Sequence, residues 1–278
     1  MKISMIQMNT KDNKVENLRV AGELIEKAAV NDRPDLITLP ETFTSMTSDF
    51  DVQYANSETI PDGEACRMLS DLARKHGVYI HGGSMAERSE GKCYNTTVVF
   101  DPTGAVRATY RKIHLFDVDV PNGRSYRESD TMKRGEEVVV TEAAGTTIGL
   151  AICYDLRFPE LFRALRDKGA RVIFLPAAFT MMTGRDHWEA LIRARAIETQ
   201  CYMVAPGQVF DHDNGKKVCF GRSMIVDPWG TVVATASDQV GCTTADIDPE
   251  YTEVIRGKMP VMTHHVLGKA PLRETEDA

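Results

Sequence analysis

One stretch constrains the fold more than any other: residues 146–169, where an apolar, β-branched segment passes directly into a segment of helical periodicity. Residues 146–152 have the composition of a buried strand. Residues 159–168 carry leucines at helical spacing, with Pro159 in the first turn and Gly169 just past the end. Cys153 therefore falls at the carboxyl end of a strand, the edge where open α/β sheets bind ligands. It is either a nucleophile, whose pKa the helix N-terminus lowers, or a buried structural cysteine.

The rest of the chain continues this alternation of strands and helices, which is typical of βαβ units around buried sheets. In the first half, we expect strands over residues 1–8, 35–39 and 78–84, and helices over 14–30 and 63–76. In the second half, we expect strands over residues 137–140, 171–175, 201–205 and 243–247, and helices over 185–200 and 249–256. Each half also contains a hairpin, over residues 94–110 and 218–236.

The turns of these two hairpins match each other, at residues 101–104 (DPTG) and 227–230 (DPWG). Because each turn joins antiparallel strands within its own half, the sequence predicts a pseudo-repeat. We expect two α/β halves whose mixed sheets face each other, with helices outside, in a single domain spanning residues 1–278. The connection over residues 112–135 is long enough to be functional or disordered. From about residue 261 the tail lacks periodicity and is either an arm packed on a partner or disordered.

Composition and charge exclude several classes of protein. The formal net charge of −7 argues against a nucleic-acid-binding surface. No apolar run is long enough to cross a membrane, and residues 1–8 lack the apolar region of a signal peptide. The six cysteines are scattered without a C-x-x-C pair, which argues against a zinc site or disulfide scaffold and for a reducing cytoplasm. His264 and His265 are adjacent in a polar tail, a spacing that disfavours metal binding, so we expect neither metal nor other cofactor.

Three charged residues follow predicted strands and are candidates for chemistry beside a thiol. Glu41 ends the strand over residues 35–39; partial burial there predicts a raised pKa and a general base, the alternative being a capping or solvated glutamate. Lys112 follows the strand ending at residue 110 and either favours a thiolate and an oxyanion or lies on the surface. Glu128 lies in the long connection, where position alone predicts a solvated side chain.

The order of Glu41, Lys112 and Cys153 at three strand ends resembles the Glu–Lys–Cys arrangement of the nitrilase (carbon–nitrogen hydrolase) superfamily. The local strings resemble it as well: LPE at 39–41, YRKIHLFD at 110–117 and GLAICYDLRFPE at 149–160. Residues 184–202 are similar to the Nit branch, which holds the deaminated-glutathione amidases and the omega-amidases. The resemblance extends to about residue 267 and implies a four-layer αββα sandwich that forms a homodimer or higher homo-oligomer.

The resemblance also implies a role for each matching residue. Cys153 is then the nucleophile, Glu41 the general base, Lys112 the stabiliser of the tetrahedral intermediate, and Glu128 a second glutamate that orients the site. The backbone N–H of Tyr154 would complete the oxyanion site. The implied reaction is hydrolysis of a small primary amide, such as deaminated glutathione or an ω-amide of a dicarboxylic or keto acid, with water. Nitrilase and N-carbamoyl amidohydrolase activity remain alternatives, as does a non-catalytic member that binds a metabolite or partner protein.

Substrate-binding residues are expected close to the nucleophile. Arg157 either binds a substrate carboxylate or pairs with Asp155 or Glu160. The loop over residues 179–184, which begins with Phe179 and Thr180 and continues with two methionines, is expected to face the substrate. Two arginines of the following helix, Arg193 and Arg195, have glutamates at ion-pair spacing, Glu189 and Glu198, and are expected to be structural.

Overall fold

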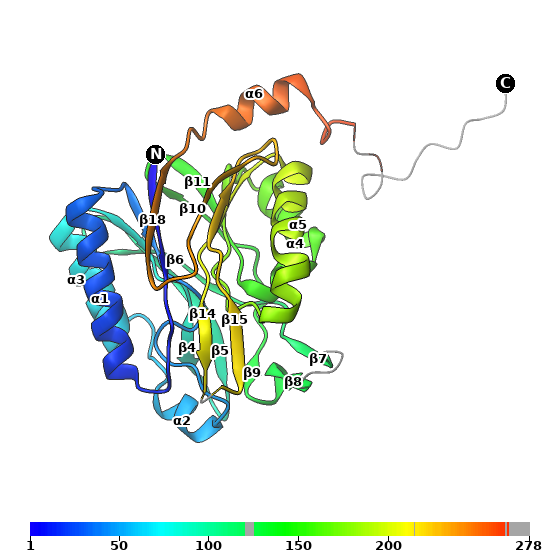
Figure 1. Cartoon of the computed structure of the whole chain (residues 1–278). Coiled ribbons are helices and arrows are strands. Elements are labelled where there is room, and N and C mark those ends of the chain that lie inside the picture. The colour runs from blue at the N-terminus through cyan, green and yellow to red at the C-terminus, as the bar shows by residue number, and fades with distance from the viewer. Residues whose placement is uncertain (120–124, 214, 265, 267–278) are drawn as a thin grey trace.

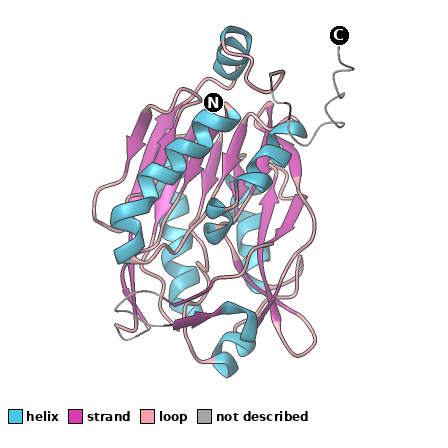
Figure 2. Ribbon diagram, turned by 90° about the vertical axis from the view of Figure 1, so that its right-hand side faces the viewer, coloured by secondary structure: helices cyan, strands magenta, loops and turns pink. Residues whose placement is uncertain are grey.

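Two mixed β-sheets lie face to face between two pairs of helices in the computed structural model, which describes residues 1–119, 125–213, 215–264 and 266 (Figures 1 and 2). The first sheet has the strand order β18 (Gly241–Asp246), β1 (Lys2–Gln7), β2 (Leu36–Thr38), β3 (Tyr79–His81), β5 (Cys93–Phe100) and β4 (Met85–Arg88), with β6 (Val106–Arg111) and β9 (Met132–Lys133) also paired to β5. The second sheet has the order β10 (Val140–Ala143), β11 (Thr146–Leu150), β12 (Val172–Phe174), β13 (Tyr202–Ala205), β16 (Met224–Val226) and β17 (Val232–Thr235).

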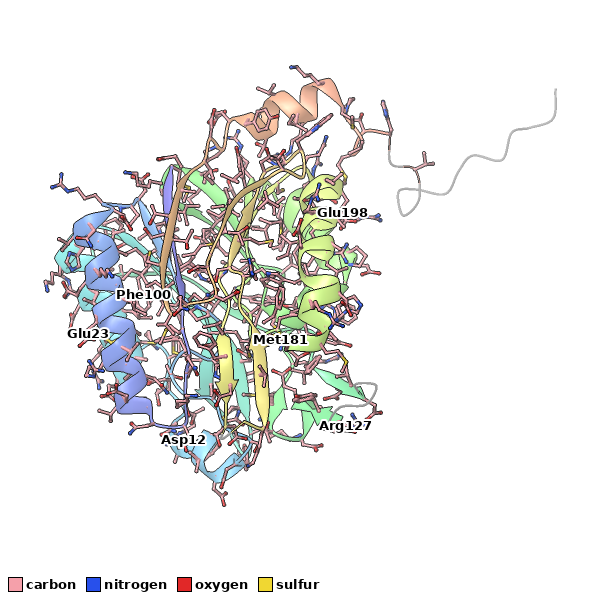
Figure 3. All side chains as sticks on the ribbon, in the orientation of Figure 1. Asp12, Glu23, Phe100, Arg127, Met181 and Glu198 are labelled. Atoms are coloured by element: carbon pink, nitrogen blue, oxygen red, sulfur yellow. The ribbon has the colours of Figure 1, made fainter. Side chains whose placement is uncertain are left out.

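Helices cover the outer face of each sheet, which confirms the four-layer fold expected from the sequence. Helices α1 (Lys14–Asn31) and α3 (Glu64–His76) cover the first sheet, and α4 (Pro159–Asp167) and α5 (Met181–Thr199) cover the second (Figure 1). The acidic side chains of Glu23 and Glu198 accordingly lie on opposite outer sides of the molecule (Figure 3). Smaller elements lie around this sandwich: α2 (Phe50–Ala55), β7 (Asp117–Asp119), β8 (Ser125–Arg127), β14 (Val209–His212), β15 (Lys217–Phe220) and α6 (Tyr251–Lys258). No helix in the described ranges is long and apolar enough to span a bilayer.

The predicted pseudo-repeat is present in the strand pairing. In both sheets, an antiparallel edge pair (β18–β1 or β10–β11) is followed by two parallel pairs and then by an antiparallel pair. The two matching turns form the same hydrogen bonds: Asp101 accepts from Thr103 and Ala105, and Asp227 accepts from Trp229 and Thr231 in the same way. The two halves therefore share both their topology and their turn chemistry.

Side-chain alternation along the strands builds one core between the sheets and another beneath the helices. On β5, Val99 packs into the inter-sheet core, whereas Val98 and Phe100 pack under α1 and α3. His81 of β3 stacks on Phe174 of β12, with ring centroids 5.0 Å apart, and so joins the two sheets directly. The sheets are held together by buried side chains on both sides, and this fixes the relative positions of their strand ends.

Several predicted boundaries are wrong, each for a local reason. The helix expected from residue 185 begins at Met181, so most of the expected 179–184 loop is helical. The strand expected over residues 218–226 is two strands, because Gly221 and Arg222 adopt positive φ angles and end β15 before β16 begins. The strand expected over 137–140 begins only at Val140. The short α2 and β4 were not predicted.

The long connection over residues 112–135 is structured on both sides of its undescribed part. It contains β7, β8, a turn of 3₁₀ helix at Glu128–Asp130, and β9. Its central residues 121–123, His265 and residues 267–278 of the predicted tail lie outside the described residues. The connection therefore brings Glu128 back to the sheet edge where Lys112 lies.

Strand direction explains why the candidate residues meet. Strand β6 is antiparallel to β5, which is antiparallel to β3, so β6 runs in the same direction as β2. Glu41, just after β2, and Lys112, just after β6, therefore emerge at the same edge of the first sheet. The carboxyl ends of β11 and β12 lie together at one edge of the second sheet, because the two strands are parallel. Ala178, which follows β12, donates its N–H to Glu41 at 2.8 Å, so this edge faces the edge of the first sheet where Glu41 lies.

Candidate active site

The strand ends surround one cavity of about 510 Å³. It opens toward the end of the molecule where α2, β7 and β8 lie, and Arg127, one of its lining residues, is seen there in Figure 3. All eight residues that the sequence singled out for catalysis or substrate binding line it: Glu41, Lys112, Glu128, Cys153, Tyr154, Arg157, Phe179 and Thr180. The structure thus brings the predicted set together, while the roles given to its members stay predictions.

Glu41 is held on every side by hydrogen-bond donors. Its Oε1 accepts from the Lys112 ammonium at 3.1 Å and from the Asn95 amide at 2.9 Å, and its Oε2 accepts from the Ala178 N–H at 2.8 Å. Its own backbone carbonyl accepts from the Gln208 amide at 2.9 Å. These contacts fix the carboxylate with one face toward the cavity.

The expected pKa shift of Glu41 has the wrong sign. Burial raises the pKa of this carboxyl, but the positive charges of Lys112 and Lys217, together with hydrogen bonds from Cys153 and Lys112, hold its pKa below the ordinary value for a glutamate. Glu41 is therefore ionised at neutral pH. An ionised carboxylate can accept a proton directly, so the lowered pKa of Glu41 is also compatible with the general-base role.

Lys112 is one of the largest fully buried side chains, and its charge is neutralised by two carboxylates. Besides Glu41, its ammonium binds both oxygens of Glu128, at 3.1 and 2.8 Å. Burial lowers the pKa of this lysine, but the charges of Glu128 and then Glu41 raise it well above the ordinary value. The ammonium is therefore a permanent positive charge rather than a proton donor, and it suits electrostatic stabilisation.

Glu128 is not solvated, contrary to what its position in a long connection predicts. Its Oε2 also accepts from the Phe116 N–H at 2.6 Å, and its Oε1 accepts from the Asn95 amide at 3.3 Å. Asn95 thus donates to both glutamates. Neither its position inside a strand nor its residue type indicated this role, so sequence reasoning missed it.

Cys153 begins a five-residue turn of 3₁₀ helix, Cys153–Arg157, and adopts a φ of +45°. Such a backbone is strained for a residue with a side chain, and hydrogen bonds from Cys153 and from the residue before it hold it in place. The Cys153 N–H donates to the Pro176 carbonyl at 2.9 Å, and the Ile152 N–H donates to Asp155 at 2.8 Å. The next N–H, that of Tyr154, donates no hydrogen bond within the described chain.

The pKa predicted for Cys153 is also wrong in direction. Burial and the negative charge of Glu41 raise the pKa of this thiol well above its ordinary value, more than the charge of Lys112 lowers it. The expected dipole is weak here because helix α4 begins only at Pro159, six residues further on. At rest the site therefore holds a thiol beside a carboxylate, not a thiolate.

Asp155 is a second residue that sequence reasoning did not identify as part of the site. It is fully buried, and it accepts from the Tyr110 hydroxyl at 2.7 Å and from the backbone N–H and Nδ1 of His114 at 3.1 and 2.7 Å. Together with its bond from Ile152, these contacts tie the Cys153–Arg157 turn to the segment that carries Lys112.

Arg157 forms no hydrogen bond or ion pair with Asp155 or Glu160, both of which the structure describes, so the structural pairing considered from the sequence is absent. Its guanidinium lies 5.3 Å from the centre of the Phe179 ring, and its closest polar contact is His187 at 3.5 Å. It therefore faces the cavity without a carboxylate partner in the described chain.

The helix after this loop behaves largely as expected. Arg193 pairs with Glu189 at 3.5 Å and Arg195 with Glu198 at 3.1 Å, which confirms the predicted ion pairs. Phe179, Thr180 and Thr183 of the expected loop line the cavity, as predicted for a loop that faces the substrate. Met181 and Met182 do not line it and are 44% and 42% exposed at the start of α5.

Comparisons with known proteins agree with this geometry. The carbon–nitrogen hydrolase family model matches residues 2–256. The chain is 39% identical to a deaminated glutathione amidase of Synechocystis, covering 94% of this chain and 96% of the relative, and 40% identical to an omega-amidase of Xenopus tropicalis, covering 94% and 93%. Among solved structures, the NitFhit protein of C. elegans superposes with a TM-score of 0.88 at 37% identity, over 95% of this chain and 64% of that one. The resemblance read from the strand ends is thereby confirmed: the chain belongs to the carbon–nitrogen hydrolase family.

Proposed function

We propose that the protein hydrolyses the C–N bond of a small carboxylated amide, through a thioester formed at Cys153. The observation that carries this proposal is the ionised Glu41, fixed by three donors beside a protonated thiol in a cavity of about 510 Å³. Deaminated glutathione and ω-amides of dicarboxylic or keto acids are the leading substrates, because the two relatives described above carry those activities in their names.

The resting charges define the order of events. Lys112 is the ammonium that binds both Glu41 and Glu128, so ionising Cys153 in place would add a third negative group to a cluster that holds one directly bound ammonium. Transfer of the thiol proton to Glu41 leaves the number of charges unchanged. The nucleophile therefore forms as Cys153 attacks the amide carbon and Glu41 takes its proton, a general-base contribution of roughly 10²–10⁴-fold.

The tetrahedral intermediate needs donors for its oxyanion. The Lys112 ammonium and the unpaired N–H of Tyr154 fit this role, since the N–H of Cys153 is already bonded to Pro176. Loss of one such donor typically costs about 3–4 kcal/mol of transition-state stabilisation. Protonated Glu41 then delivers its proton to the departing nitrogen, and later it activates the water that hydrolyses the thioester.

The carboxylate at the far end of the acyl group would bind Arg157, whose guanidinium has no acidic partner in the described chain. Phe179 and Thr180 would form the wall beside it, since both line the cavity at the end of β12. We also propose a cytoplasmic homodimer. The six cysteines are free, and the exposed apolar side chains of Ile197 and Trp229 lie at neighbouring positions, which suits a subunit contact.

The test is a kinetic panel of carboxylated amides, neutral amides, nitriles and N-carbamoyl acids, with ammonia or amine release as the readout. Wild-type protein should prefer the carboxylated amides, and a rapidly quenched reaction should show the acyl mass on the Cys153 peptide. Cys153→Ala should remove turnover, whereas Cys242→Ser, which alters a partly exposed cysteine on β18, should retain it. Turnover of nitriles alone would contradict the substrate class. Undiminished turnover in Cys153→Ala would contradict the mechanism, and absence of any turnover would favour a binding protein.

A further inference from the structure

Asn95 contacts both glutamates of the candidate active site but has no step of its own in the proposed reaction. It lies on β5, four residues before Val99, which packs between the two sheets, so the Asn95 side chain points to the same side of the strand. Asn95 is 2% exposed and lines the cavity. Its backbone carbonyl accepts the N–H of Lys112 at 2.8 Å, so its main chain and its side chain both contact catalytic groups.

The side-chain amide of Asn95 closes a ring of four hydrogen bonds. Its nitrogen, which carries two hydrogens, donates to Oε1 of Glu41 at 2.9 Å and to Oε1 of Glu128 at 3.3 Å. The Lys112 ammonium donates to the same two oxygens, at 3.1 Å each. Each Oε1 therefore accepts two donors, which together occupy both of its lone pairs. The ring holds the two carboxylates in fixed orientations.

The two Oε2 atoms differ from each other, and this separates the roles of the glutamates. Oε2 of Glu128 accepts from the Lys112 ammonium at 2.8 Å and from the Phe116 N–H at 2.6 Å. Oε2 of Glu41 accepts one N–H in the described part of the chain, that of Ala178, at 2.8 Å. Of the four carboxylate oxygens, Oε2 of Glu41 alone has a lone pair left there for a further proton.

The thiol of Cys153 is the source of that proton. It lies within hydrogen-bonding reach of the Glu41 carboxyl, a contact that lowers the pKa of Glu41 and raises that of Cys153. Because both lone pairs of Oε1 are occupied, a proton could bind there only by displacing the Asn95 amide or the Lys112 ammonium. A proton on Oε2 displaces neither of them. Without the Asn95 amide, Oε1 would be open to the proton as well, and the carboxylate would be free to turn.

We propose that Asn95 is a positioning residue which, together with Lys112, confines proton transfer by Glu41 to its Oε2. This inference rests on the proposed function and adds the atom through which the proton moves. In the first part of the step, the C–S bond forms while the thiol proton of Cys153 passes to Oε2. The C–N bond then breaks as the same oxygen gives this proton to the departing nitrogen, so Glu41 ends the step ionised.

Asn95→Leu tests this assignment, since leucine has a similar volume but its side chain donates no hydrogen bond. With the best carboxylated amide, kcat should fall by about 10–100-fold, the effect of losing a hydrogen bond to a charged group, while KM changes by less than about threefold. A hydrogen bond to the ionised form lowers the pKa of a carboxyl, so its loss should move the acid limb of kcat/KM up by about one pH unit. Asn95→Ala leaves room for water, which can donate to Oε1 in part, so its changes should be smaller.

A second measurement does not depend on amide hydrolysis. The rate at which iodoacetamide alkylates Cys153, followed by mass analysis of its peptide, reports removal of the thiol proton by Glu41. In Asn95→Leu the acid limb of this rate should also move up by about one pH unit.

Asn17→Leu is the matched control for both measurements. Asn17 is 4% exposed and its amide donates two hydrogen bonds, to the backbone carbonyls of Lys11 and Thr44, but it does not line the cavity. The control should lose stability while both acid limbs stay in place.

The outcomes distinguish a positioning role from other roles and from the function itself. If both acid limbs stay in place in Asn95→Leu and Asn95→Ala, or move equally in Asn17→Leu, the assignment is overturned. A rise in KM with unchanged kcat would overturn it as well, because Asn95 would then act by binding substrate. If the wild-type protein hydrolyses no amide but Asn95→Leu still moves the alkylation limb, the proposed function fails and the positioning role of Asn95 stands.

Discussion

Asp155→Asn tests the view that a buried carboxylate holds the turn over Cys153–Arg157 in place. Asp155 is fully buried and accepts four hydrogen bonds, from Ile152 N, from the Tyr110 hydroxyl, and from N and Nδ1 of His114, at 2.7–3.1 Å. An asparagine oxygen can keep two of these donors, and its amide can donate to His114 Nδ1 in the other tautomer of the ring. The His114 backbone N–H is then left facing a donor.

The magnitude follows from these contacts. One buried donor left unsatisfied costs about 1–3 kcal/mol. The two retained bonds lose the strengthening that an ionised acceptor provides, roughly 1 kcal/mol each. The free energy of unfolding should therefore fall by about 3–5 kcal/mol. The turnover of a carboxylated amide should also fall, because the Ile152 N–H anchor adjoins Cys153.

The assay is urea unfolding followed by circular dichroism, with Asp227→Asn as the matched control. Asp227 also accepts two backbone N–H groups, but it does so in an exposed turn where asparagine forms the same bonds. The control should lose less than about 1 kcal/mol. If the two variants differ by less than about 1 kcal/mol, within the error of such extrapolations, the reasoning about Asp155 is refuted.

Three other predictions concern packing and pH. Gly184→Ala should destabilise the fold by about 1–3 kcal/mol in thermal unfolding, because the added Cβ would overlap the Phe220 side chain. Gly257→Ala is the control: its added Cβ meets nothing within 4 Å, so it should be neutral or stabilising. Equal changes in stability for the two variants would contradict this reasoning. Burial lowers the pKa of His81 to about 3. Below about pH 6.5 the unfolded chain therefore binds a proton at this residue, whereas the folded chain does not until about pH 3. Stability should then fall with decreasing pH by about 1.4 kcal/mol per unit down to about pH 3, and urea unfolding of His81→Gln should lack this contribution. Because the pKa of Glu41 is lowered and that of Cys153 raised, kcat/KM should stay flat from about pH 5 to about pH 8, and a narrow maximum would contradict these directions.

Local sequence patterns were sufficient to place three of the site residues at strand ends. Residues such as Pro40, Pro159 and Gly169 stop or start elements through their own backbone preferences, so Glu41 and Cys153 could be located without knowledge of the rest of the chain. The convergence of these ends in one cavity depended on the resemblance, because periodicity says where a strand ends but not which strands are neighbours.

Asn95 and Asp155 show what local patterns do not contain. Asn95 lies within a strand whose other residues are largely buried, and nothing in its neighbours indicates that its amide bridges two glutamates. Asp155 looked like a partner for a nearby arginine, whereas two of its partners, Tyr110 and His114, lie more than 40 residues away in the chain. Contacts of this kind are set by tertiary packing.

The two wrong pKa directions have a related cause. From the sequence, burial predicted a raised pKa for Glu41, and a helix N-terminus, together with the charge of Lys112, predicted a lowered pKa for Cys153. The folded site adds the charges of Lys112 and Lys217 to the first residue and that of Glu41 to the second, and these change the balance. Electrostatic signs at such a site require the full set of neighbouring charges.

The stacking of His81 on Phe174 joins the two halves of the repeat, so activity depends on how firmly the two sheets stay packed together. Glu41 and Lys112 are carried by one half and Cys153 by the other, so neither half contains all the groups that the proposed reaction requires. A shift of a few ångströms between the two sheets would separate the Glu41 carboxyl from the Cys153 thiol while every strand and helix stayed intact. Upon heating, loss of turnover should therefore precede loss of secondary structure, which makes activity the more sensitive gauge of how well the halves are joined.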